Sequence, residues 1–155
     1  IAVGLMVEAR AVFPAAILLA MLGLFGTLME GVLHCDSGCK GATGAGAAHL
    51  ASGMFGFICG VIALFLFARR WRSDARWLGH VRFSRYCAWA AAISLVLFVV
   101  SDGAPSVSGL AQRLFAAMLL VWIAGTGWRL SQPAEGIGVI APSADGRGLS
   151  GVPTP

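Results

Sequence analysis

Charged residues are scarce in this chain: Asp, Glu, Lys and Arg together make up 12% of its 155 residues. Hydrophobic residues account for 58%, and the mean hydropathy is +0.83. A soluble globular protein of this length needs many more polar side chains to cover its surface. The composition therefore excludes a soluble domain and indicates an integral membrane protein.

The short motifs that identify common enzymes are missing as well. The sequence has no Gly-x-Ser-x-Gly nucleophile elbow, no His-Glu-x-x-His motif and no paired Cys-x-x-Cys pattern. Ionisable groups are nearly missing from the middle of the apolar stretches, which argues against a transporter or a channel. The only basic run flanks an apolar stretch, so nucleic-acid binding is not expected.

What the chain does have is four apolar stretches of about twenty residues, the length of helix that crosses a bilayer core about 30 Å thick. They cover residues 11–33, 49–67, 83–100 and 110–128. Only helices and closed barrels satisfy backbone hydrogen bonds in lipid. We therefore predict an all-α fold, a polytopic transmembrane helix bundle over residues 11–130 with four spans and short connections.

Arginine is concentrated in one connection, the one between the second and third apolar stretches. Its six arginines are Arg69, Arg70, Arg72, Arg76, Arg82 and Arg85. Short cytoplasmic loops collect basic residues, so we expect residues 34–48 and 101–109 to face outward and the C-terminus to be cytoplasmic. The predicted location is the cell inner (plasma) membrane.

Aromatic residues and one histidine flank the inner ends of the predicted spans. Trp71, Trp77 and Trp128 are interpreted as interface anchors, because an indole ring is stable where it is half wetted. His80, within the arginine-rich connection, is expected to be solvated.

The two ends of the chain differ from its middle. Residues 1–10 are mostly apolar and lack an initiator Met, so we interpret them as the end of a preceding span or a cytoplasmic flank. Residues 131–155 contain four prolines and many Gly and Ser, and we expect a disordered cytoplasmic tail.

Small residues recur on one face of the second stretch. Ser52, Gly56 and Gly60 have four-residue spacing, with Gly53 beside them. Such a ridge lets helices approach closely in lipid, where packing drives association. It could serve oligomerisation or packing within the chain, and we favour packing within the chain.

Polar residues collect where the predicted spans meet the outer membrane surface. We interpret these residues as a candidate outer-rim cluster: Glu30, His34, Asp36, His49, Asp102, Gln112 and Arg113. The favoured interpretation is that these groups satisfy one another, with Arg113 neutralising Glu30 or Asp36.

Other chemistry remains open for the same cluster. His34 and His49 with Asp36 or Glu30 could bind zinc or a similar ion, whereas two thiolates with a histidine would suit copper. An acid–base pair could hydrolyse a lipid headgroup or an amide bond, and two histidines could ligate haem. No cofactor is firmly implied.

The four cysteines divide by position. Cys35 and Cys39 lie in the predicted outer loop, where oxidation is permitted, and we expect a disulfide between them in preference to a redox-active or metal-binding pair. Cys59 and Cys87 lie within spans and are expected to pack as small apolar side chains.

The order of these features resembles a family of bacterial multi-span membrane proteins, the domain-of-unknown-function 998 family. The resemblance rests on the run from Cys35 to Cys39, then His49, then Arg69-Arg70, and finally the run from Gly109 to Leu114. It covers about residues 10–130. It implies about six spans in the full natural protein and no particular reaction.

The sequence favours a non-catalytic accessory or scaffold subunit of a larger membrane complex. The alternative is a membrane protein that binds lipid, a small molecule or a metal at the outer rim, a lipid hydrolase included. The expected partners are membrane lipids and other membrane protein subunits.

Overall fold

The computed structural model describes residues 2–101 and 104–132. The regular elements in these residues are all helical: α1 (Ala2–Gly23), the π-helical segment η1 (Leu24–Met29), α2 (Glu30–Val32), α3 (Gly44–Trp71), the 3-10 turn η2 (Ala75–Trp77), α4 (Leu78–Val100) and α5 (Pro105–Ser131). Residues 133–155, where we expect a tail, lie outside the described residues.

Within residues 2–101 and 104–132, four stretches of helix are long and apolar enough to cross a membrane: Val12–Val32, Gly44–Trp71, Ala75–Val100 and Ser106–Ser131. The predicted all-α architecture with four potential spans is thus confirmed. α1, η1 and α2 follow one another without a break, and residues 2–10 are the first turns of α1.

The helices extend beyond the apolar stretches because their ends are capped. α3 begins five residues before His49, where the Thr43 side chain accepts a hydrogen bond from the Gly46 backbone N–H. Its last turn carries Arg69 and Arg70, whose charge is favourable beside the free carbonyl groups of a helix C-terminus. α5 has Pro105 in its first turn, where the missing N–H costs little.

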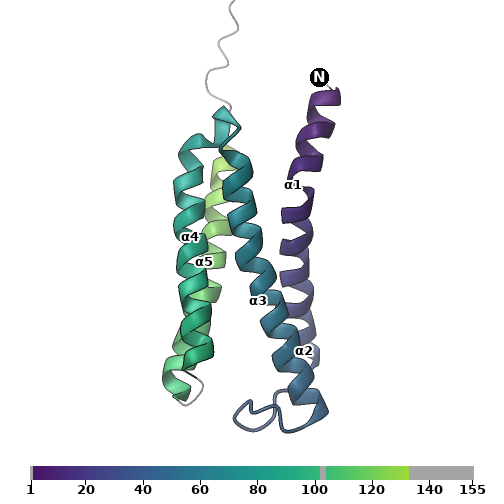
Figure 1. Ribbon diagram of the computed structural model, residues 1–155, viewed down its shortest axis with the longest axis vertical. Helices are drawn as coiled ribbons and strands as arrows, with labels where there is room; N and C mark the ends of the chain where they lie inside the picture. Colours follow the sequence, from purple (N-terminus) through teal and green to yellow (C-terminus); the bar gives the residue numbers. More distant parts are fainter. Residues whose placement is uncertain (1, 102–103, 133–155) are drawn as a thin grey trace, which may run out of the picture.

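α3 is the central helix of the molecule. α1 and η1 pack on one side of α3, while α4 packs on its other side and is itself paired with α5. Figure 1 shows the 33–43 loop, the end of α4 and the start of α5 at one end of the molecule. The start of α1 and the arginine-rich α3–α4 connection lie at the opposite end. We call these the outer end and the inner end, following the predicted orientation.

The buried core lies between α3, α4 and α5. Phe57 on α3 contacts the rings of Phe98 and Phe115, with ring centroids 6.4 Å and 4.5 Å away. Toward the inner end, the indole N–H of Trp122 donates a 2.7 Å hydrogen bond to the buried hydroxyl of Ser84. This bond satisfies a polar pair that would otherwise be costly to bury.

The small-residue ridge of α3 faces the continuous helix formed by α1, η1 and α2 of the same chain. A Cβ atom built on Gly56 would lie 2.7 Å from the Gly26 Cα, and one on Gly60 would lie 3.1 Å from the Leu22 side chain. Ser52 instead donates to the His49 carbonyl within its own helix, and Gly53 takes its place against α2. The structure therefore uses Gly53, Gly56 and Gly60 as the contact ridge.

Candidate functional site

The outer end is organised by the loop between α2 and α3. The structure joins Cys35 and Cys39 in a disulfide, and the Cys39 backbone N–H donates to the Asp36 carbonyl at 2.7 Å. Gly38 turns the chain with φ 75°, in the left-handed region that glycine adopts without steric cost. The loop is thereby closed on itself beside the start of α3.

Asp36 fastens this loop to α3. Its carboxylate accepts hydrogen bonds from the Thr43 backbone N–H at 2.9 Å and from the Thr43 hydroxyl at 2.5 Å. The Thr43 hydroxyl in turn accepts from the Gly46 N–H at 3.1 Å. These hydrogen bonds favour the ionised form, and the side-chain bond from Thr43 is the main reason why the pKa of Asp36 is lowered. Asp36 thus acts through Thr43 in capping α3.

Gly46 is needed for this contact. A Cβ atom built at Gly46 would overlap the Asp36 carboxylate, so any larger residue there would push the carboxylate off Thr43. The loop and the first turn of α3 therefore fit each other through backbone as well as side-chain groups.

His49 links α3 to the end of the first span. Its Nδ1 lies 2.9 Å from the Leu33 carbonyl oxygen, and its Nε2 lies 4.0 Å from Glu30 Oε1. The two side chains are 19% and 20% exposed, so both are mostly covered. Gly53 faces the Glu30 carboxylate and leaves the space that it occupies. Two polar residues that are costly at a membrane edge thus lie side by side.

The donor atoms of Cys35, Cys39 and His49 all lie within 4.8 Å of one another. The sequence predicts His34, His49 and Asp36 as metal candidates. The structure instead gathers two cysteine sulfurs and a histidine, the set that the sequence leaves open for copper, because Asp36 is turned toward Thr43 while His34 is exposed. Of the zinc candidates only His49 belongs to it.

The remaining predicted rim residues do not join this group. Gln112 and Arg113 are exposed on α5, which packs on α4, whereas Glu30 and Asp36 belong to the α1 side of α3. In the described residues no ion pair joins Arg113 to either carboxylate, so the predicted neutralisation by Arg113 is not seen. Asp102 lies outside the described residues.

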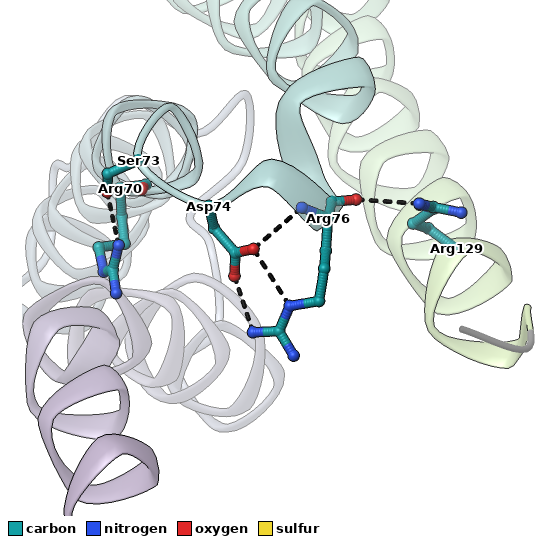
Figure 2. A network of polar contacts seen from close by, with 5 residues as sticks. All are labelled: Arg70, Ser73, Asp74, Arg76 and Arg129. Carbon is teal, nitrogen blue, oxygen red and sulfur yellow. Dashed lines mark hydrogen bonds and ion pairs between the residues drawn. The ribbon is translucent and has the colours of Figure 1, made fainter. Parts of the chain in front are cut away.

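A second polar network lies at the inner end (Figure 2). Arg76 binds Asp74 through two nitrogens, Nε to Oδ1 at 3.1 Å and Nη2 to Oδ2 at 2.8 Å. Arg70 donates to the Ser73 hydroxyl at 2.6 Å, and Arg129 donates to the Arg76 carbonyl at 2.9 Å. The side-chain bond from Arg76 is the main reason why the pKa of Asp74 is lowered. The network ties α5 to the α3–α4 connection.

An open cavity of about 200 Å³ adjoins this network. Its lining combines guanidinium, carboxylate, indole and aliphatic groups: Val12, Arg70, Trp71, Asp74, Arg76 and Trp77. Basic and indole groups together are typical of membrane interfaces, where they meet lipid headgroups.

Three aromatic rings at the inner end form a stack that the sequence does not reveal. Trp71 is 7% exposed and lies parallel to Trp77, with ring centroids 4.5 Å apart, and to Trp122 at 5.9 Å. The interpretation of Trp71 as a half-wetted anchor is therefore wrong, because α4 and α5 cover it. Trp128, at 72% exposure, does lie on the surface.

The surroundings of His80 also differ from those predicted. It is half-buried, its ring packs against Trp71 and Trp77, and its Nε2 lies 3.2 Å from the Thr126 hydroxyl. The expectation of a solvated residue is wrong because α4 begins at Leu78, which places His80 on a helix that packs on α5. In the described part of the chain, this is the one hydrogen bond between a hydroxyl and a histidine.

A family model described as "Protein of unknown function (DUF998)" matches residues 1–129. The comparison with curated proteins and the comparison with solved structures gave no match.

Proposed function

Since the chain belongs to the DUF998 family, whose description names no function, we propose a function from its own geometry: it is a non-catalytic subunit of a membrane assembly. The observation that carries the proposal is that the polar groups of the outer end hold the chain together. Asp36 caps α3 through Thr43, and His49 binds the Leu33 carbonyl. An enzyme would keep such groups available to its substrate.

The exposed face of α4 supports a partner helix. Its large side chains follow a spacing of three and four residues: Tyr86, Trp89, Ile93, Val96 and Val100, all between 56% and 74% exposed. An apolar seam with this spacing is the pattern by which two helices pack along their length. Aromatic residues are also enriched where proteins meet. We therefore assign the α4 seam to a helix of another membrane subunit.

The proposed orientation follows from the charges. Arg69, Arg70, Arg76 and Arg129 all belong to the inner end, whereas Lys40 is the basic residue of the 33–43 loop. By the positive-inside rule, the inner end and the C-terminus are proposed to be cytoplasmic in the plasma membrane. Residues 34–48 and 101–109 would then face outward.

The test is native mass spectrometry of the full chain, extracted from its own membrane in a mild detergent. We expect a defined complex that contains this chain and at least one other membrane protein. The variant Ile93→Trp replaces an aliphatic side chain at the centre of the α4 seam by a larger aromatic one and should dissociate the complex. The matched control Leu120→Trp makes the same kind of change at a position of α5 that is 66% exposed and should leave it intact.

Far-ultraviolet circular dichroism of each variant shows whether the helices are retained, so that loss of the complex is not confused with unfolding. A monodisperse wild-type chain without partner would overturn the proposal. So would equal dissociation by Ile93→Trp and Leu120→Trp.

A further inference from the structure

Two sulfur atoms and one imidazole meet at the outer end of the molecule. The Sγ atoms of Cys35 and Cys39 and a ring nitrogen of His49 lie within 4.8 Å of one another. The cysteines come from the 33–43 loop, and His49 comes from the second turn of α3. The hydrogen bonds from Thr43 to Asp36 hold that loop against α3, so the donors are brought together by the fold.

The tautomer of His49 is suited to metal binding. A carbonyl oxygen only accepts hydrogen bonds, so the 2.9 Å contact with the Leu33 oxygen requires a proton on Nδ1. In the neutral ring Nε2 then carries a free lone pair. Metal-ligating histidines are typically oriented in this way, with the other ring nitrogen donating to a backbone carbonyl or a carboxylate.

A carboxylate lies on the side of this free nitrogen. Glu30 Oε1 is 4.0 Å from His49 Nε2, and the space for it exists because residue 53 is glycine. A negative charge at this distance stabilises a bound cation and is within reach of a fourth ligand position. Sulfur, nitrogen and carboxylate oxygen are the ligand types of zinc.

We propose that Cys35, Cys39 and His49 form a redox-gated site for Zn²⁺, which the Cys35–Cys39 disulfide closes and its reduction opens. In the disulfide neither sulfur is a thiolate, the form that binds metals. Tetrahedral zinc with bonds of about 2.3 Å to sulfur and 2.0 Å to nitrogen separates its donor atoms by roughly 3.5–3.8 Å. Donors within 4.8 Å therefore need only small side-chain movements once the S–S bond is broken.

The opening step is a thiol–disulfide exchange with a dithiol reductant. A thiolate of the dithiol attacks Sγ of Cys39, which is exposed, and Cys35 leaves as the thiolate. The second thiol of the dithiol then loses its proton and attacks the mixed disulfide, so that Cys39 is released and the reductant leaves as a disulfide. The two cysteine sulfurs take up the two protons of the dithiol. Binding of Zn²⁺ to the two cysteine thiols and His49 releases two protons and forms two Zn–S bonds and one Zn–N bond.

The site is tested with Co²⁺ as a spectroscopic probe, on the full chain in detergent and without oxygen. We expect the reduced chain to bind one Co²⁺ with a thiolate-to-cobalt charge-transfer band in the near ultraviolet, which added Zn²⁺ removes. The oxidised chain should show no such band. Alkylation followed by mass measurement confirms the redox state, because the oxidised chain has only Cys59 and Cys87 as free thiols.

Variants distinguish this ligand set from adventitious binding. Cys35→Ser should abolish the two-thiolate band, and His49→Gln should raise the dissociation constant for Co²⁺ by at least about tenfold. The matched control His34→Gln changes an exposed histidine of the same loop and should have no effect. Replacing Cys59 and Cys87 together by serine should also leave the band in place.

Three results would overturn the proposal. They are a reduced wild-type chain that binds no Co²⁺ at micromolar concentration, equal binding by the oxidised and reduced chains, or equal losses from His34→Gln and His49→Gln. Each can occur whether or not the chain associates with other subunits, so the metal site and the proposed function fail independently.

Discussion

Gly56 is the position where the backbone of η1 comes close to α3, and Gly56→Ala tests how much that approach stabilises the protein. The added Cβ would lie 2.7 Å from the Gly26 Cα and 3.2 Å from the Phe25 carbonyl carbon. Both are backbone atoms, which cannot rotate away as a side chain can. The two helices must therefore separate or shift along their whole contact.

The magnitude follows from comparison with an uncrowded glycine. Forcing one extra methyl group into a packed contact costs about 1–3 kcal/mol. Replacing glycine by alanine in a helix also contributes up to about 1 kcal/mol in the opposite direction. Gly23→Ala shares this helix gain, but apart from its own helix backbone and chain neighbours no atom lies within 4 Å of its added Cβ. The free energies of unfolding of the two variants should thus differ by about 1–3 kcal/mol.

Gly60→Ala should fall between them. Its Cβ would lie 3.1 Å from a methyl carbon of Leu22, a flexible side chain that can move aside. We expect it to be destabilised relative to Gly23→Ala by under about 1 kcal/mol. The predicted order of stability is Gly23→Ala, then Gly60→Ala, then Gly56→Ala.

The assay is reversible unfolding in mixed micelles with increasing sodium dodecyl sulfate, followed by tryptophan fluorescence and circular dichroism. Equal midpoints for Gly56→Ala and Gly23→Ala would show that η1 is not packed on the glycine ridge of α3. A reversed order of Gly60→Ala and Gly56→Ala would refute the distinction between backbone and side-chain contacts.

Two further predictions concern single polar contacts. The pKa of Asp36 is lowered in the folded protein, so the stability that its carboxylate contributes is complete above its ordinary pKa near 4 and is lost as the pH falls through the lowered value. Asp36→Asn should abolish this loss of stability at acid pH in pH-dependent unfolding. An unchanged acid limb would contradict the capping role of Asp36 through Thr43. Ser84→Ala leaves the buried Trp122 N–H without its acceptor and should cost about 1–3 kcal/mol. In the Ser84→Ala background, Trp122→Phe should cost less stability than it does in the wild-type protein, because the hydrogen bond is already lost. Strictly additive costs in this double-mutant cycle would show that the bond contributes nothing.

The all-helical architecture could be predicted because it depends on local properties of the chain. Apolar stretches long enough to span a bilayer must form helices there, since lipid offers no partner for backbone groups. The basic end of the molecule could equally be predicted, because six arginines lie between residues 69 and 85. Helix bounds were less accurate, because capping by Thr43 extends α3 beyond its apolar stretch.

The candidate site could be predicted only in part. The polar residues near His49 and the pairing of Cys35 with Cys39 were expected because they lie close together in sequence. The contacts of Asp36 and Arg113 could not be predicted, because they depend on which way each side chain turns and on which helix lies beside it. Asp36 turns to Thr43, and α5 carries Arg113 along α4 rather than along α1.

The sequence by itself thus determined that residues 11–130 form membrane-length helices with one basic end and one polar, cysteine-containing end. Only the tertiary structure decided that Trp71 and His80 are covered, that Gly53 and Gly56 receive α2 and η1, and that His49 meets two sulfur atoms. The physical reason is the range of the interactions. Helix formation and membrane insertion depend on neighbours along the chain, whereas burial and ligand sets depend on contacts between helices that sequence spacing does not specify.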